Sequence, residues 1–241
     1  MSPPLSKAGH PGEAHRGNLG ERANRIRAGV LGANDGIVSV AGLVLGVVGA
    51  TTDNKAILFA GLAGLVAGAL SMATGEYVSV SSQRDTEHAA VQKEMRELAE
   101  DPEGELKELA GLYVKRGLSA ELAHQVALEL TDHDALAAHS EVELNIAPGE
   151  YVNPWTAAVS SMVAFTIGAL IPLLAIVLAP ESAQVAVTVV AVIIALAITG
   201  YFSATLAGSP VSRAILRNIV GGSLAMAITY AVGHVVGTTL G

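Results

Sequence analysis

Five long apolar stretches dominate the pattern of hydrophobic and polar positions along the chain. They cover roughly residues 28–50, 55–80, 154–179, 183–207 and 213–239, and all are rich in Ala, Val, Leu, Ile and Gly. A helix needs about 20 mostly apolar residues to cross a bilayer. Short polar breaks, TTDNK at 51–55, APES at 179–182 and GSPVSR at 208–213, separate most of them. The pattern therefore predicts an all-α membrane protein with five transmembrane helices.

A charged insert, residues 81–153, separates the second apolar stretch from the third. It holds 16 acidic and 6 basic residues, a local charge of −10, whereas the whole chain carries −8. The acidity therefore belongs to one module. We predict four segments: a cytosolic tail at 1–27, transmembrane helices 1–2 at 28–80, an acidic helical domain at 81–153, and transmembrane helices 3–5 at 154–241.

The insert has the helix signals of a three-helix domain. Its first part continues the second span into water, and DPEG then breaks the helix. Asp101 is a good N-cap, Pro102 a good first helical residue and Gly117 a good stop, while Ser119 caps a third helix. Its predicted core includes the apolar positions Leu106, Leu109, Leu112, Leu122, Val126 and Leu130.

Composition and charge narrow the function classes. Only 15% of residues are charged, against about 25% in a typical soluble domain, and mean hydropathy is +0.49. Cysteine is absent, which excludes disulfides and thiolate metal sites, and the net negative charge argues against nucleic-acid binding. Thirteen of the fourteen Lys and Arg residues fall in the tail, the insert and positions 213 and 217. These segments are predicted to be cytoplasmic, with the C-terminus outside.

The first apolar stretch contains a carboxylate in the sequence GANDGIVSV, at Asp35. An acidic side chain at membrane depth costs about 2.5–3.5 kcal/mol on insertion scales, and such groups usually line an ion or proton path. Gly32, Gly36 and Ser39 share a helical face with Asp35. We expect these small residues to let helix backbones approach closely and also to leave room for an ion. The alternative is an aspartate that bonds a neighbouring helix.

The second apolar stretch carries Met72 and Glu76, four residues apart and thus on one helical face. A thioether beside carboxylates is a soft-plus-hard ligand set for a first-row divalent metal. The alternative for Met72 is ordinary packing.

Two glutamate pairs flank the DPEG turn, each pair three residues apart: Glu94 with Glu97, and Glu105 with Glu108. A helical hairpin would bring the pairs together as an oxygen-rich site for Fe²⁺ or Mn²⁺. The alternative is a solvated acidic surface.

Histidines in the insert offer further ligands. His139 and Glu143 are four residues apart, so both could face the carboxylate cluster. Glu121 and His124 form the one Glu-x-x-His pair, of which di-iron bundles use two. The alternative for Glu121 is a purely structural role, because an acidic residue suits the first turn of a helix.

Three segments together resemble the vacuolar iron transporter family, including its nodulin-like branch. RAGVLGANDGIVSVAGLVLGVVGA resembles the family's first membrane helix, AGALSMATGEYVSVSSQRD its second and NPWTAAVSSMVAFTIGALIPLL its third, within a similarity over about residues 22–240. The resemblance implies a dimer of five-helix subunits with a cytosolic metal-binding domain after helix 2. It also implies export of Fe²⁺, and often Mn²⁺, in exchange for protons.

The resemblance assigns roles to individual residues. It places Asp35 and Met72 on the translocation path and Glu76 at the neighbouring cytoplasmic mouth. The family's four helical glutamates and a further acidic ligand correspond to Glu94, Glu97, Glu105, Glu108 and Glu143. Eukaryotic iron transporters tend to have methionine where this chain has His139, which leaves the preference between iron and other divalent metals open. The nodulin-like LGANDG beside an acidic domain suggests a prokaryotic member.

The sequence thus predicts a homodimeric, proton-coupled exporter of Fe²⁺ or Mn²⁺ rather than an enzyme. Its expected partners are divalent metal ions, protons and the lipid bilayer, without nucleic acid, and no cofactor is expected to be permanently bound. The expected location is the cell membrane, or the vacuolar membrane in a eukaryote. Two alternatives remain: a membrane-anchored ferroxidase or metal-storage protein that uses the insert, and a structural membrane protein whose acidic module docks a basic partner.

Overall fold

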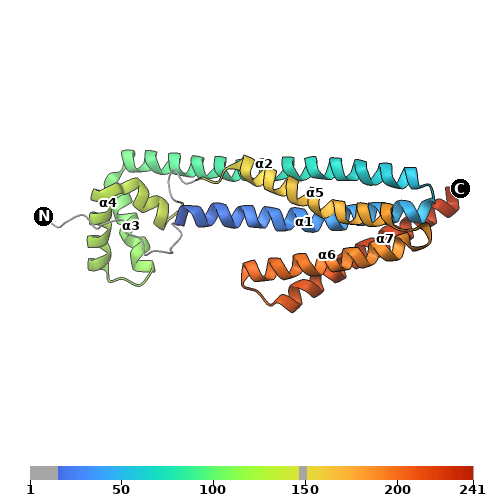
Figure 1. The fold of residues 1–241 in the computed structure, drawn as a ribbon. Coiled ribbons are helices and arrows are strands. Elements are labelled where there is room, and N and C mark those ends of the chain that lie inside the picture. The colour runs from blue at the N-terminus through green and yellow to red at the C-terminus, as the bar shows by residue number, and fades with distance from the viewer. Residues whose placement is uncertain (1–15, 147–150, 241) are drawn as a thin grey trace. The chain divides into compact units, whose positions relative to one another are not determined.

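The structure is a computed structural model that describes residues 16–146 and 151–240, with side chains from residue 26 onward. Over these residues it is helical without strands (Figure 1). The elements are α1 (Arg16–Ala50), α2 (Asn54–Glu100), α3 (Pro102–Lys115), α4 (Ala120–Val142), α5 (Pro154–Leu178), the short 3₁₀ turn η1 (Glu181–Ala183), α6 (Gln184–Ala207) and α7 (Val211–Leu240). The predicted tail lies outside the described residues over positions 1–15.

Five of these helices are long and apolar enough to cross a membrane within the part of the chain that the structure describes. They are Ile26–Ala50, Asn54–Glu100, Pro154–Leu178, Glu181–Ala207 and Val211–Thr239. This confirms the predicted all-α membrane fold with five transmembrane helices. Contacts divide the chain into two compact units, which are described separately below. We call residues 22–78 and 154–241 the membrane unit, and residues 1–21 and 79–153 the acidic unit.

In the membrane unit, α1 is the helix around which the others pack. It supplies five fully buried residues to the apolar core, more than α2, α5, α6 or α7: Ile37, Val40, Ala41, Val44 and Leu45. The other helices add further buried residues to this core, among them Phe165 and Leu173 of α5, Leu196 of α6 and Met226 of α7. Antiparallel α6 and α7 form a long hairpin (Figure 1).

Glycines allow the backbones around α1 to approach closely. A Cβ atom at Gly36 would meet the carbonyl oxygen of Phe165 in α5, and one at Gly233 of α7 would meet that of Gly46. Small residues are the usual means by which helices associate in lipid, where no hydrophobic force drives them together. The space beside Gly32 and Gly36 is filled by α5 backbone, so the expectation that these two glycines leave room for an ion was wrong.

In the acidic unit, the predicted caps are found. Asp101 accepts a hydrogen bond from the amide of Gly104 at 2.9 Å, and Ser119 accepts one from Leu122 at 3.3 Å. Gly117 has φ +101°, the left-handed conformation that suits a residue just past a helix end. The segment after Val78 continues α2 to Glu100, as expected.

The small core of the acidic unit lies between α3 and α4. It is built on Leu109, Ala127 and Ala138, with Leu106 and Leu130 packed against it. Leu122, predicted as a core residue, is 49% exposed, so that prediction was wrong. Leu122 lies at the edge of the apolar stripe of its helix, where the sequence pattern is compatible with either a buried or an exposed position.

A break inside α4 was not predicted. Asp134 has the non-helical angles φ −164° and ψ 94°, and its carboxylate accepts a hydrogen bond from the amide of Ala137 at 2.9 Å. Asp134 therefore ends one helical segment and caps a second one, which runs over 135–142. This second segment carries His139, which is completely buried.

We predict that Gly233→Ala destabilises the membrane unit by about 1–3 kcal/mol, because the new methyl group must displace the backbone of α1. Thermal unfolding of the purified protein in detergent measures the effect. Gly221→Ala is the matched control on α7, since a Cβ there has no neighbour within 4 Å. Equal melting temperatures for the two variants would contradict a tight α1–α7 crossing.

Candidate functional site

Three side chains from three helices converge in the acidic unit. Glu94 of α2, Glu105 of α3 and His139 of α4 each offer a ligand atom, and these atoms all lie within 4.8 Å of one another. The Nδ1 atom of His139 is 2.8 Å from Glu94 Oε1 and 3.5 Å from Glu105 Oε2. We call these three residues the carboxylate–histidine cluster.

Local sequence explains how the three residues meet. The α2 helix stops at Glu100, and the Asp101 cap starts α3 in a new direction, which allows Glu94 and Glu105 to face each other across the turn. The Asp134 break redirects the end of α4, where His139 sits. Hairpin formation was predictable from DPEG, whereas the redirected end of α4 was not.

The cluster is enclosed. The side chains of His139, Glu94 and Glu105 are 0%, 3% and 13% exposed. Among the described residues, Glu94 Oε1 and His139 Nε2 have no partner of good hydrogen-bond geometry, and His139 Nδ1 lies at ion-pair distance from Glu94 Oε1. Buried polar atoms are normally satisfied. Three enclosed ligand atoms that converge in this way suit a cation between them, so these residues fit a bound metal ion.

Burial and crowding set the ionisation of the cluster. Burial, reinforced by the charges of Glu143 and Glu105, raises the pKa of Glu94 to about 7. Burial, with the charge of Glu108, also raises the pKa of Glu105. For His139, burial lowers the pKa against the opposing pull of Glu143 and Glu108. Without a metal, the cluster therefore disfavours both full ionisation of its carboxyl groups and a charged imidazole. A divalent cation would favour the ionised carboxylates and would bind the neutral imidazole.

The other predicted ligands lie around this cluster rather than in it. Glu143 Oε2 is 3.9 Å from His139 Nδ1 and its side chain is 31% exposed. Glu97 forms an ion pair with Lys93 at 2.7 Å and is 38% exposed, and Glu108 is exposed. The structure thus brings together one glutamate of each predicted pair. The other two glutamates face outward.

The predicted path residues all belong to the membrane unit. Asp35 accepts a hydrogen bond from the hydroxyl of Ser39 at 2.6 Å, one turn along α1. Met72 is partly buried and packs against the apolar core. Glu76 is buried, and one of its oxygens lies 2.6 Å from Nη2 of Arg27. The sequence analysis placed Arg27 at the end of the predicted cytosolic tail and missed this contact.

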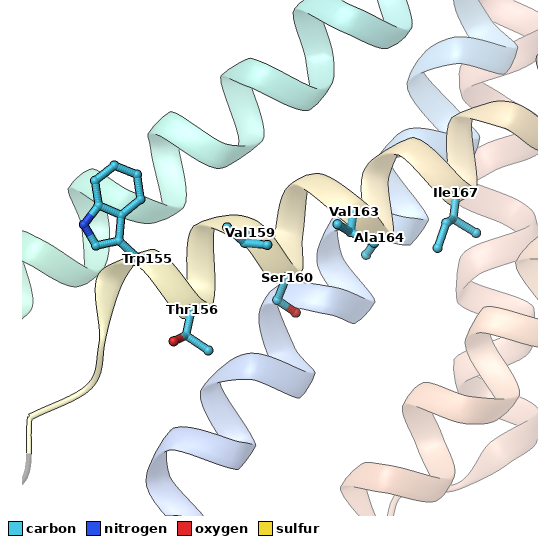
Figure 2. Close-up of a pocket in the computed structure, with 7 residues that line it drawn as sticks. All are labelled: Trp155, Thr156, Val159, Ser160, Val163, Ala164 and Ile167. Atoms are coloured by element: carbon cyan, nitrogen blue, oxygen red, sulfur yellow. The ribbon is translucent and has the colours of Figure 1, made fainter.

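Two hollows in the membrane unit lack metal ligands. Figure 2 shows one along α5, of about 690 Å³, lined by Trp155, Thr156, Val159, Ser160, Val163, Ala164 and Ile167. Another, of about 500 Å³, lies between α1, α5 and α6 and has only apolar side chains and Thr199 on its walls. Neither is lined by a carboxylate or an imidazole. Their chemistry suits lipid tails rather than a cation.

Comparison with known proteins agrees with this picture of a helical membrane protein. Residues 26–234 match the model of the VIT family. The chain belongs to the VIT family. It is 46% identical over 224 residues to a vacuolar iron transporter from Acanthamoeba castellanii, covering 92% of this chain and 82% of that protein. It is 36% identical over 219 residues to vacuolar iron transporter homolog 4 of Arabidopsis thaliana, covering 90% and 87%.

The rice relative, vacuolar iron transporter homolog 1 of Oryza sativa subsp. japonica, is 40% identical over 223 residues, with 92% of this chain and 78% of the relative covered. These VIT-family relatives are named as transporters and not as enzymes, which agrees with the expectation from the sequence. The assignments to a nodulin-like branch and to a prokaryote stay predictions.

We predict that Glu94→Gln stabilises the metal-free acidic unit at alkaline pH. The folded-state pKa of Glu94 is about 7, above the ordinary 4.5. Its favourable contribution is therefore complete below pH 4.5 and is lost as the pH rises through 7. Gln does not ionise and so avoids that loss. The variant should therefore exceed wild type in free energy of unfolding by at most about 3 kcal/mol at pH 8 and by little at pH 4.5.

Hydrogen exchange of the α3 and α4 amides, in the full-length protein with a chelator present, measures this local stability. Glu129→Gln, an exposed change on α4, is the control. Slower exchange at pH 8 in the Glu94 variant alone is the expected result. Equal exchange in wild type and variant would mean that Glu94 ionises without cost.

Proposed function

We propose that this chain transports divalent iron or manganese out of the cytosol across the cell membrane in exchange for protons. The observation that carries the proposal is the carboxylate–histidine cluster, in which three enclosed ligand atoms lie within 4.8 Å of one another. Membership of the VIT family, and the names of its iron-transporting relatives, support iron as a cargo.

The acidic unit would collect the metal. The imidazole of this ligand set suits Fe²⁺, and its two carboxylates suit Mn²⁺. Glu143 is near enough to complete the coordination by a small rotation, since its Oε2 is 3.9 Å from His139 Nδ1. Glu97 and Glu108 supply outer negative charge that attracts cations. The metal is cargo here, and no resident cofactor is proposed.

The membrane unit would move the metal. Asp35 carries the only acidic side chain between Arg27 and Thr52 in α1 and the turn after it, and Ser39 already solvates it. A carboxylate in that position can hold a cation or a proton, which is the requirement for exchange. Met72 would add a soft thioether ligand, and Glu76 would lie at the cytoplasmic mouth. Nothing in the apolar hollows competes for this role.

Orientation and assembly complete the proposal. Thirteen of the fourteen Lys and Arg residues lie in segments that the positive-inside rule assigns to the cytoplasm. The N-terminus and the acidic unit would then face the cytosol, and the protein would act as a homodimer. Ferroxidase activity is not proposed. The Glu-x-x-His pair, Glu121 and His124, is exposed and lies outside the carboxylate–histidine cluster.

We predict that Asp35→Asn lowers proton-driven metal flux at least tenfold, because the amide keeps the size of the side chain but cannot exchange a proton for a cation. Uptake of Fe²⁺ and Mn²⁺ into proteoliposomes under an imposed pH gradient is the measurement. Met72→Ala should reduce flux less, since a thioether contributes ligation without charge.

The matched control for this experiment is Asp53→Asn, which changes the exposed aspartate that bonds the amide of Lys55 at the start of α2. This variant should transport like wild type. Wild-type flux from Asp35→Asn would show that the aspartate only packs the helices. Absence of flux in the wild-type protein, with or without a gradient, would refute the proposed function itself.

We also predict that His139→Met lowers Mn²⁺ affinity by at least tenfold and shifts preference toward softer ions, because a thioether is a poor ligand for a hard cation. Calorimetric titration of the full-length protein with Mn²⁺, Fe²⁺, Co²⁺ and Zn²⁺ gives the ranking. His133→Met, an exposed position on α4, is the control. An unchanged ranking in His139→Met would exclude this histidine as a ligand.

A further inference from the structure

The ion pair between Arg27 and Glu76 is asymmetric. The glutamate side chain is 7% exposed, whereas the arginine side chain is 56% exposed, and the closest atoms are 2.6 Å apart. The carboxylate is therefore enclosed, and the cation reaches it from a more exposed position. A carboxylate this buried is unfavourable without a compensating cation, because its hydration is lost on burial. Of the two partners, Arg27 is the one that can exchange.

Arg27 cannot leave by losing its proton, since guanidinium stays charged at all physiological pH values. It can leave only by swinging its whole side chain away. The backbone at this point is fixed, because the next residue, Ala28, is completely buried. Arg27 therefore has a long, half-exposed side chain with one positive charge, and its backbone is anchored beside the carboxylate. A divalent cation brings twice that charge to the same oxygen.

The pair lies on the two helices that carry the proposed path. Glu76 is four residues after Met72 in α2, and Arg27 is eight residues before Asp35 in α1. Both spacings keep the paired residues within about 80° of one another around their helix. The proposed path therefore begins at Glu76, whose carboxylate is already paired with Arg27.

We propose that Arg27 is a tethered counter-ion that occupies Glu76 until a divalent metal ion displaces it. Glu76 is then a metal-binding residue, and Arg27 is a built-in competitor that sets the metal concentration at which the membrane unit fills. The inference rests on the proposed function, because it concerns the metal that this function moves. In physical terms, the side chain of Arg27, with one positive charge, competes with a free divalent metal ion for the enclosed carboxylate of Glu76.

A purely structural clasp between α1 and α2 would make different predictions. In a clasp, the sign of each charge is irrelevant provided that the pair remains. Arg27→Glu combined with Glu76→Arg would then behave like wild type. In the competition, the same exchange places an arginine in the enclosed position, and metal binding there is lost.

The experiment is equilibrium Mn²⁺ binding, followed by electron paramagnetic resonance, to the full-length protein in detergent. The parent carries Glu94→Gln, Glu105→Gln and His139→Gln, which silence the carboxylate–histidine cluster. Adding Arg27→Gln should lower the half-saturating Mn²⁺ concentration at least tenfold. Adding Glu76→Gln as well should abolish that binding. Arg213→Gln, which removes an exposed arginine at the start of α7, should leave the parent isotherm unchanged.

Arg27→Lys keeps a cation on a flexible stem, and we expect it to lower half-saturation only about threefold, since an ammonium group lacks the planar fork that matches a carboxylate. This variant, together with the charge exchange, keeps the test decisive if Arg27→Gln fails to fold. Unchanged isotherms in both Arg27 variants would overturn the proposal. So would a wild-type isotherm and wild-type flux from the charge-exchanged protein.

Flux in proteoliposomes separates this inference from the proposed function. With the cluster intact, Arg27→Gln should reach half-maximal uptake at a lower Mn²⁺ concentration than wild type. If no variant moves metal, including wild type, transport is refuted, and the binding isotherms still decide the role of Arg27. If wild type transports and Arg27→Gln gives a superimposable curve, only the competition is refuted.

Discussion

A carboxylate removed from water must have positive charge beside it or keep its proton, and both units of this protein are organised around that constraint. In the membrane unit, Glu76 meets it with Arg27. In the acidic unit, Glu94 has no lysine or arginine as an ion-pair partner among the described residues and instead faces a buried histidine. Burial, reinforced by the charges of Glu143 and Glu105, therefore raises the pKa of Glu94. One enclosed glutamate is neutralised by its own chain, and the other is left to a proton or to a metal ion.

Close helix packing is what encloses these groups. In the membrane unit, Gly36 and Gly233 let α1 touch the backbones of α5 and α7. In the acidic unit, the helices are short and their ends are fixed by side-chain caps at Asp101, Ser119 and Asp134. The two units therefore use different means, small residues in one and caps in the other, to hold polar groups at fixed places.

Much of the fold could be predicted from the sequence because lipid imposes a minimum length on apolar helices, and the five stretches satisfy it. The starts of α3 and α4 were predictable for a similarly local reason, since a cap residue acts on the amide three positions away. The face that each helix turns to its neighbours was not predictable, because lipid and protein are both apolar. The glycines beside Asp35 were accordingly expected both to let helices approach closely and to leave room for an ion, whereas α5 occupies the space beside Gly32 and Gly36.

The candidate site divides in the same way. Spacing placed Glu94 beside Glu97 and His139 beside Glu143, but spacing cannot say which member of a pair points inward. That choice depends on tertiary contacts, such as the ion pair that Lys93 offers to Glu97. Arg27 was missed for a related reason. It is 49 residues from Glu76, and an arginine at the end of an apolar stretch is equally typical of an interfacial anchor.

The break at Asp134 also bears on turnover of the protein. The segment 135–142 is only two turns long, and isolated helices of that length are unstable in water. It is held by the Asp134 cap at one end and at the other by Arg116, whose guanidinium donates to the carbonyl of Val142 at 2.8 Å. The rest of its support is the α3–α4 core, in which Ala138 is packed, and His139, which is buried among carboxylates. Under the proposed function, loss of bound metal would remove one of these supports and expose the segment to proteases, so the abundance of the protein would follow its cargo.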